Sequence, residues 1–221
     1  MSTGKKILDS IIKQGILPLF YNESAEVTLE TTRTLYRAGI RVIEYTNRGP
    51  AALENFKLLK KAQQEELHDL VLGIGTIKTV QHAEDFIAAG ADFIIAPIVN
   101  PDVARVAQQH GMLWCPGCMT PTEIHLAQQH NAALIKLFPA NILGPGFVSA
   151  IKELFPGQLF MPTGGVELTL ENISGWFKAG VCAVGLGSKL ITKDVLTKGL
   201  YDQLYNDTVK AIELVKAVKT S

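Results

Sequence analysis

The chain has 221 residues, of which 47% are hydrophobic, and its 21 basic and 21 acidic side chains give a net charge of zero. A chain of this length and composition can bury one sizeable core, so we expect a single domain over residues 1–221. Without a basic tract, neither nucleic acid nor an anionic membrane is expected as a partner. No run of 18 apolar residues and no signal-peptide core occurs, which predicts a cytoplasmic protein.

Short apolar runs alternate with helical stretches along the whole chain. Residues 1–14 predict a short amphipathic helix, and a last helix is expected from about residue 200 to residue 218. Between them, apolar runs predict strands at 16–20, 42–46, 71–74, 93–96, 113–115, 133–138, 159–161 and 183–186. Strands that are each followed by a helix predict an α/β fold whose parallel sheet closes into a (β/α)8 TIM barrel.

Residues that begin and end helices support this interpretation. Asn22 or Ser24 can open the helix after the first strand, and Pro50 suits the first turn of the next one. Residues 120–123, T-P-T-E, form a capping box with proline at the first helical position. Glycines at 39, 90, 111 and 180 close four helices. The main alternative is an open, doubly wound sheet, but residues 21–24 read Y-N-E-S where its glycine-rich fingerprint would stand.

One lysine interrupts an apolar strand. The stretch A-L-I-K-L-F-P-A, residues 133–140, places Lys136 among aliphatic neighbours. An ammonium there is poorly solvated, which favours the neutral, nucleophilic amine that forms a Schiff base with a carbonyl substrate. The alternative is that Lys136 lies near the end of the strand and extends its ammonium to water.

A glutamate occupies the second expected strand, I-R-V-I-E-Y-T-N-R. Glu44, Thr46 and Arg48 share one face there, because side chains alternate along a strand. A buried glutamate needs a partner, so one interpretation is a structural ion pair with Arg48 or Lys136. The functional interpretation makes Glu44 a general acid and base beside Lys136, with Arg48 binding a carboxylate through both nitrogens.

Further polar and glycine-rich groups follow other strands. The third strand ends G-I-G-T, which places the Thr76 hydroxyl at the barrel mouth, and Pro97 ends the fourth. The last two strands are followed by P-T-G-G (162–165) and G-L-G-S (185–188). Backbone N–H groups in such turns bind anions, and barrels commonly hold a phosphate at these two loops. A phosphorylated substrate is therefore expected; the alternative is that small residues only close the barrel top.

Three cysteines and five histidines predict neither a disulfide framework nor a metal site. Cys115 and Cys118 spell C-x-x-C, which in redox proteins opens a helix. Here residues 112–116 are expected to end a strand, and Pro116-Gly117 to turn into the next helix. A zinc site would need a second pair of ligands, and only Cys182 remains. The histidines fall in helical or pre-strand stretches and are expected to be solvated: His68, His82, His110, His125 and His130.

In order along the chain, Glu44, Arg48, Thr76, P-G-x-x-T-P-x-E (116–123), K-x-F-P-A (136–140) and P-T-G-G (162–165) resemble the family of 2-keto-3-deoxy-6-phosphogluconate (KDPG) and 4-hydroxy-2-oxoglutarate (KHG) aldolases. The likeness runs from about Ile16 to Leu190. It implies a class I aldolase on a (β/α)8 barrel that needs no metal or other cofactor. It also implies a homotrimer whose partner is a small phosphorylated keto sugar acid.

The resemblance implies a role for each matching residue. Lys136 is similar to the Schiff-base lysine of the family and Glu44 to its proton-transferring carboxylate. Arg48 and Thr76 match residues that hold the pyruvate carboxylate, and the turns after the last two strands match the phosphate end. The substrate-binding set implied in this way is Arg48, Thr76, Pro97, Phe138, Thr163, Gly164, Gly165, Gly187 and Ser188.

Three departures from the family pattern leave the sugar acid open. The family often reads E-V-T-L-R-T where this chain has E-Y-T-N-R-G. Many members carry a basic residue after strand one, where this chain reads L-F-Y (19–21). The usual G-G-S-W-L is G-L-G-S-K-L here, so Lys189 replaces a tryptophan.

The expected reaction is cleavage of KDPG to pyruvate and glyceraldehyde 3-phosphate, with cleavage of 4-hydroxy-2-oxoglutarate to pyruvate and glyoxylate as a second activity. Alternatives within enzymes are an aldolase for another 2-keto-3-deoxy sugar acid, such as the galactonate epimer, and a phosphate-binding epimerase or isomerase barrel. Outside enzymes, the alternatives are a C-x-x-C redox or interaction module and a non-catalytic sugar-phosphate sensor.

Overall fold

The computed structural model describes residues 3–219, and strands occupy the predicted apolar runs. All strand pairings in these residues are parallel. Six strands form one sheet in the order β5-β4-β3-β2-β1-β9, and three form a second in the order β6-β7-β8. Their bounds are β1 (Ile16–Phe20), β2 (Val42–Thr46), β3 (Val71–Gly75), β4 (Phe93–Ile95), β5 (Leu113–Cys115), β6 (Gly117–Cys118), β7 (Leu134–Leu137), β8 (Leu159–Pro162) and β9 (Val184–Leu186).

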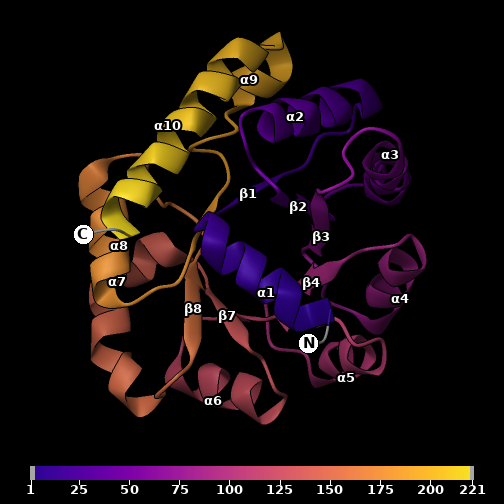
Figure 1. Cartoon of the computed structure of the whole chain (residues 1–221). Helices are drawn as coiled ribbons and strands as arrows, with labels where there is room; N and C mark the ends of the chain where they lie inside the picture. The colour runs from indigo at the N-terminus through magenta and orange to yellow at the C-terminus, as the bar shows by residue number, and fades with distance from the viewer. Residues whose placement is uncertain (1–2, 220–221) are drawn as a thin grey trace.

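The two sheets together form one barrel. β1 pairs with β9, the first strand with the last, with Ile16 opposite Val184. Thr163, directly after β8, bridges to Gly185 on β9 and joins the sheets on one side. On the other side only Pro116 separates β5 from β6. Figure 1 shows the strands at the centre and the helices around them. The predicted (β/α)8 barrel is confirmed, with its fifth strand in two pieces.

The broken fifth strand corrects one prediction. Gly117 does not turn into a helix: Gly117–Cys118 stay extended as β6, with Gly117 opposite Lys136 on β7. Pro116 has no N–H to give to a neighbouring strand, so the ladder is interrupted there. Its carbonyl still accepts a hydrogen bond from the Lys136 N–H, which keeps the chain in the barrel wall. The helix begins only at Pro121.

The helices follow the predicted signals with one shift. Ser24 caps α2, Thr120 and Glu123 form the predicted capping box of α6, and the glycines at 39, 90, 111 and 180 adopt positive φ. Pro50 instead lies in a turn, because α3 begins at Ala52. The bounds are α1 (Thr3–Gln14), α2 (Ala25–Arg37), α3 (Ala52–Glu65), α4 (Val80–Ala88), α5 (Pro101–Gln109), α6 (Pro121–Gln129), α7 (Ala140–Ile151), α8 (Leu170–Ala179), α9 (Lys193–Lys198) and α10 (Tyr201–Lys219), with a 3-10 turn at Lys152–Leu154.

The first and last helices were both predicted. Residues 1–2 of the expected first helix lie outside the described residues, and the last helix differs from its predicted span by one residue at each end. Between residues 3 and 219, no helix combines the length and the apolar character that crossing a membrane requires.

Helix α1 closes one end of the barrel. Its buried Ile7 and Ile11 pack in one cluster with inward-facing residues near the strand starts, including Leu17 and Val42. The Gln14 side chain donates hydrogen bonds to the carbonyls of Ile16 and Val42, the first residues of β1 and β2, so it bridges the starts of these two strands. Figure 1 shows this helix lying across the centre of the ring. A substrate must therefore enter at the opposite end, where the strands finish and barrel enzymes carry their active sites.

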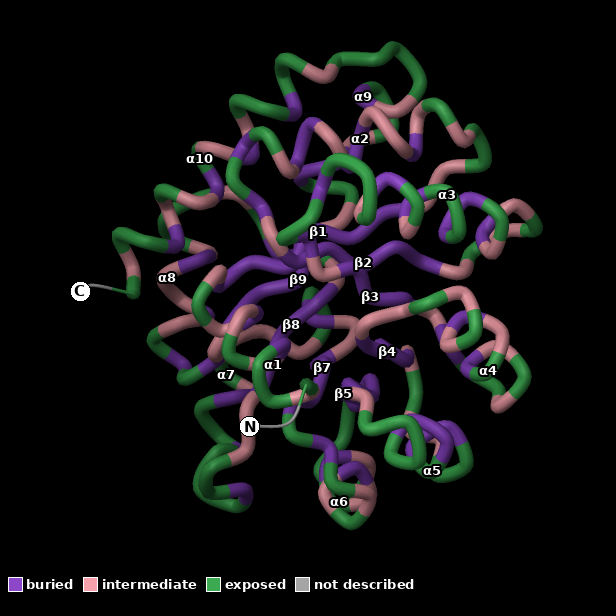
Figure 2. Tube along the Cα trace, turned by 45° about the vertical axis from the view of Figure 1, so that its right-hand side comes forward, coloured by how far each residue is buried: buried purple, intermediate pink, exposed green. Residues whose placement is uncertain are grey.

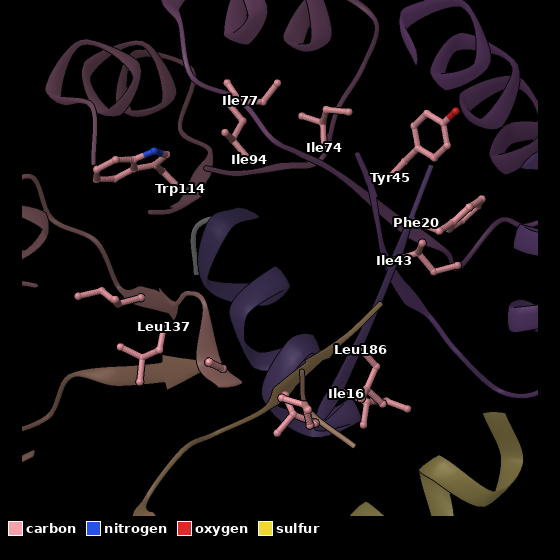
Figure 3. Close-up of a cluster of buried hydrophobic side chains, with 14 of the residues drawn as sticks. Ile16, Phe20, Ile43, Tyr45, Ile74, Ile77, Ile94, Trp114, Leu137 and Leu186 are labelled. Atoms are coloured by element: carbon pink, nitrogen blue, oxygen red, sulfur yellow. The ribbon is translucent and has the colours of Figure 1, made fainter. Parts of the chain in front are cut away.

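A second, larger core fills the layer between the barrel and the outer helices. Figure 2 shows the strands buried and the helices exposed on their outer sides. In Figure 3 the Phe20 and Tyr45 rings lie next to each other, with their centres 5.4 Å apart. The Tyr45 hydroxyl donates to the Asn22 carbonyl, which ties the loop after β1 to β2. This packing fixes the strand ends that carry the site.

Candidate active site

Lys136 and Glu44 face each other inside the barrel. Strand β7 holds Lys136 between Gly117 on β6 and Met161 on β8. The lysine side chain is only 5% exposed and the glutamate side chain 0%. The Lys136 Nζ lies 3.8 Å from Glu44 Oε1 and 5.2 Å from the centre of the Phe138 ring. The lysine does not extend to water, so the alternative of a solvated ammonium is wrong.

The Glu44 carboxylate has an unusual environment. Neither of its oxygens accepts a hydrogen bond from the residues that the structure describes. Burial raises the pKa of Glu44, and the positive charges of Lys136 and Arg48 oppose that rise only in part. A raised pKa makes an ionised carboxyl group a stronger proton acceptor, which suits Glu44 to general acid–base catalysis.

A cavity of about 430 Å³ lies at the C-terminal end of the strands. Phe138 lines it and also contacts the lysine, so the cavity adjoins the Lys136–Glu44 pair. Its walls come from the ends of β1 and β9, from the loops after β1, β2, β7, β8 and β9, and from helix α9. Seven of the predicted substrate-binding residues line it together: Arg48, Phe138, Thr163, Gly164, Gly165, Gly187 and Ser188.

The turn after β8 brings backbone and one hydroxyl to this cavity. Gly164 and Gly165 adopt left-handed φ angles of 92° and 82°. A Cβ on Gly165 would lie 2.4 Å from the Cβ of Asn141, so this position must carry no side chain. The Thr163 hydroxyl is buried and has no hydrogen-bond partner among residues 3–219. A buried hydroxyl without a partner is costly, which suits a group that a ligand will bind.

The rim of the cavity is positively charged. Arg48, Lys189 and Lys193 line it, whereas no Asp or Glu of the described chain does. The Lys189 Nζ lies 3.1 Å from Glu167 Oε1, and both side chains are half exposed. Lys193, at the start of α9, was not predicted from the sequence. The signal that could have found it is Thr192, a helix cap only a few residues after the G-L-G-S turn.

Comparison with known proteins agrees with this geometry. The model of the family "Aldolase: KDPG and KHG aldolase" matches residues 7–206. The chain belongs to this family. It is 30% identical over 211 residues to the 2-dehydro-3-deoxy-phosphogluconate aldolase of Treponema pallidum, covering 95% of this chain and 97% of that protein. It is also 35% identical over 121 residues to the 2-dehydro-3-deoxy-6-phosphogalactonate aldolase of Escherichia coli, covering 54% of this chain and 58% of that protein.

Solved structures of the KDPG/KHG aldolase family share the fold. The aldolase for 4-hydroxy-2-oxoglutarate and 2-dehydro-3-deoxyphosphogluconate from TTHB1 superimposes with a TM-score of 0.81 at 30% identity, covering 94% of this chain and 98% of that one. The Legionella pneumophila KDPG aldolase superimposes with a TM-score of 0.85 at 24% identity, covering 96% and 98%. That protein was solved with pyruvate captured as a covalent carbinolamine intermediate.

Lys136 and Glu44 lie beside the cavity and not in its wall, and two of the substrate-binding residues implied by the KDPG/KHG aldolase resemblance also lie outside that wall. Thr76 directly follows β3 and Pro97 is the second residue after β4; neither lines the cavity. Thr76 has a positive φ of 63°, which is rare for a β-branched residue. A strained backbone angle at a barrel mouth is consistent with a functional site. Contact of either residue with substrate stays a prediction.

The cysteines of this aldolase form no dithiol site. Cys115 belongs to the cluster inside the barrel, whereas Cys118 belongs to the outer core. Both are buried, and burial raises the pKa of the Cys118 thiol to about 12. Cys118 also lies on a strand and not at the start of a helix, so the features of a redox C-x-x-C motif are missing.

The histidines lie away from the site. His68, His110 and His125 are exposed as expected, whereas His82 and His130 are half buried; none of the five lines the cavity. Between residues 3 and 219, no group of three or more His, Cys, Asp or Glu side chains comes together as metal ligands would.

Proposed function

We propose that this chain is a class I aldolase that cleaves KDPG to pyruvate and glyceraldehyde 3-phosphate through an imine on Lys136. The observation that carries the proposal is the buried Lys136–Glu44 pair, 3.8 Å apart, next to a cavity with a cationic rim. An epimerase or isomerase barrel would be expected to carry metal ligands or paired acids at its strand ends, whereas between residues 3 and 219 no Asp or Glu lines the cavity and no metal-ligand cluster forms.

The first half of the reaction builds an electron sink. The neutral Lys136 amine attacks the keto carbon of the substrate, and loss of water gives an imine that is protonated on nitrogen. Glu44 is the nearest proton-transferring group, and its raised pKa suits it to deliver the proton that water needs to leave. Arg48 and Thr76 hold the carboxylate of the pyruvate half, so that the C3–C4 bond is oriented for cleavage.

The second half breaks the carbon–carbon bond. Glu44 takes the proton from the C4 hydroxyl, the C3–C4 bonding electrons move into the iminium, and the aldehyde leaves. The resulting enamine accepts a proton from Glu44 at C3, and water then hydrolyses the imine to release pyruvate. In this scheme Glu44 gives up two protons, one to the leaving water and one to the enamine. It takes up two, one from the C4 hydroxyl and one released when the protonated imine is hydrolysed, so the carboxyl group ends the cycle protonated as it began.

The phosphate is proposed to bind at the turns after β8 and β9. The left-handed glycines Gly164 and Gly165 and the hydroxyl of Ser188 line that part of the cavity, with Lys189 and Lys193 at its edge. Cations and bare backbone favour a dianion over a neutral sugar end. A second substrate, the phosphogalactonate epimer, is favoured by the 35% identity to the Escherichia coli enzyme for that compound.

We further propose that the protein is a cytoplasmic homotrimer, as its family resemblance implies. Ile98 and Met119 follow β4 and β6 at the mouth of the barrel and are 46% and 38% exposed, which suits a contact between copies. Sedimentation equilibrium should give three times the chain mass of 24.0 kDa.

Trapping with borohydride tests the chemistry. Pyruvate plus borohydride should reduce the imine, inactivate the enzyme and leave an adduct that peptide mass spectrometry places on Lys136. Lys136→Met should fold and show neither adduct nor cleavage. Lys189→Met is the matched control, since it removes the other amine nearest the phosphate turn and should still be labelled at position 136. An adduct on Lys189 in the native enzyme would keep the mechanism class but refute the assignment of the nucleophile.

A substrate panel tests the specificity. The kcat/KM should be highest for KDPG and lower for its galactonate epimer and for unphosphorylated 4-hydroxy-2-oxoglutarate. A higher kcat/KM for the galactonate epimer would make that compound the proposed substrate. Equal kcat/KM values for phosphorylated and unphosphorylated substrates would refute the proposed phosphate site.

A further inference from the structure

The carboxylate of Glu44 occupies a notch in the neighbouring strand. On β3, Gly73 lies opposite Glu44 and Gly75 opposite Thr46. A Cβ built on Gly75 would lie 1.8 Å from Glu44 Oε1, 2.6 Å from Cδ and 2.8 Å from Cγ. These distances are far inside van der Waals contact. The glutamate therefore leans along the strand direction and fills the volume that any side chain at position 75 would need.

The oxygen in this notch is also the one that faces the amine. Glu44 Oε1 lies 3.8 Å from the Lys136 Nζ, and no hydrogen bond from the described residues orients either carboxylate oxygen. Nothing but the ion pair and the shape of the barrel wall therefore fixes the carboxylate. Of the glycines in the described chain, Gly75 is the one where an added Cβ would have Glu44 among its three nearest contacts.

We propose that Gly75 is a positioning residue: its missing side chain holds the Glu44 carboxylate within reach of Lys136 for proton transfer. The inference rests on the proposed imine mechanism. The barrel uses the same arrangement a second time, since a Cβ on Gly185 would lie 2.3 Å from the unpartnered Thr163 hydroxyl. In both cases a glycine on one strand accommodates a polar side chain from its neighbour.

The same strand supplies a matched control. Gly73 also faces the barrel interior, but a Cβ there would lie 2.2 Å from the Phe93 ring and meets no polar group within its three nearest contacts. Gly73→Ala and Gly75→Ala thus add the same methyl group to the same crowded wall. Both should lower the thermal unfolding midpoint, because overpacking strains a core. Only Gly75→Ala should displace the catalytic carboxyl group.

The experiment compares kcat for KDPG cleavage in the two variants, per mole of folded protein. A displacement of about 1 Å can cost on the order of 10²-fold in rate, so Gly75→Ala should lose about that factor while Gly73→Ala stays within about twofold of the native enzyme. The Gly75→Ala variant should still form the borohydride adduct on Lys136. Equal kcat losses in the two variants would overturn the inference.

A double-variant cycle separates positioning from general damage, and it covers the case in which Gly75→Ala alone does not fold. Glu44→Asp shortens the side chain by one methylene and vacates space beside position 75. The combination Gly75→Ala with Glu44→Asp should therefore fold and have the kcat of Glu44→Asp alone, or a higher one. If the alanine lowers kcat by the same factor in both backgrounds, Gly75 does not act through Glu44.

The borohydride adduct distinguishes a failure of the proposed function from a failure of the positioning role of Gly75. If the native enzyme forms no adduct with pyruvate, the proposed function fails whatever the glycine variants do. If the adduct forms on Lys136 but Gly75→Ala keeps the native kcat, only the positioning role fails.

Discussion

Replacing Glu44 by glutamine keeps the shape of a fully buried side chain and removes its ability to ionise. Burial raises the pKa of the folded-state carboxyl group above its ordinary value of 4.5, although Lys136 and Arg48 oppose the rise. Between the unfolded and folded pKa values the folded state therefore holds more protons than the unfolded state. The stability that Glu44 contributes is complete below pH 4.5 and is lost as the pH rises through the folded-state pKa.

The size of the effect follows from one proton. Linkage gives a slope of at most about 1.4 kcal/mol per pH unit for a single titrating group. The glutamine variant lacks this titration. Its free energy of unfolding minus that of the native enzyme should therefore increase with pH above 4.5 and level off beyond the folded-state pKa. Removing one member of a buried pair also costs about 3–5 kcal/mol, so the variant is expected to start out less stable.

Urea denaturation at half-unit steps from about pH 4.5 to about pH 8 measures this difference. The same comparison in a Lys136→Met background serves as control. In that background the cation that lowers the Glu44 pKa is gone, so the stability difference between the forms with and without Glu44→Gln should keep increasing to higher pH before it levels off. A difference that stays flat or falls with pH would refute the reasoning, because Glu44 would then ionise as readily when folded as when unfolded. In the kinetic assay Glu44→Gln should lower kcat by about 10² to 10⁴; near-native kcat would reduce Glu44 to an ion-pair partner.

Two further predictions concern the phosphate end of the cavity. Gly165→Asp should raise the KM for KDPG far more than the KM for 4-hydroxy-2-oxoglutarate. The isosteric, neutral Gly165→Asn should crowd Asn141 equally but raise the two KM values by similar factors. If both variants had the same effect on the two KM values, the turn would only close the barrel. In condensation with pyruvate, Lys189→Gln should raise the KM for glyceraldehyde 3-phosphate and leave the KM for glyceraldehyde unchanged. Glu167→Gln should lower the KM for glyceraldehyde 3-phosphate, because it releases Lys189 from its 3.1 Å ion pair. Effects of the same size on both aldehydes would remove Lys189 from phosphate recognition.

The barrel could be predicted because its signals are local. Apolar runs mark the strands, and left-handed glycines such as Gly39 and Gly180 end helices whatever packs around them. The break at Pro116 could not be predicted in this way. Whether the chain turns or stays extended after that proline depends on β7 and the residue after it, because the N–H groups of Lys136 and Phe138 donate hydrogen bonds to the carbonyls of Pro116 and Cys118. Such a bond joins residues about twenty positions apart and leaves no mark on the local pattern.

The chemical centre was also more predictable than its surroundings. A lysine and a glutamate in otherwise apolar strands have few reasons to be there, so Lys136 and Glu44 could be paired before any distance was known. Lys193 was missed because α9 reaches the cavity through tertiary packing of Val195 and Leu196. The sequence of a six-residue helix does not indicate where that helix packs. The role proposed for Gly75 depends on where the Glu44 side chain leans, and strand pairing alone does not give that.

The pairing of β1 with β9 also affects how the protein is made. A ribosome adds about 5–20 residues per second, so Ile16 is synthesised roughly ten to thirty seconds before its partner Val184. During that interval the nascent chain presents one edge of β1 with unpaired backbone groups, and exposed edges invite pairing with other chains. Incomplete chains that stop before β9 are therefore expected to aggregate or be degraded, and translation speed becomes a factor in the yield of active enzyme.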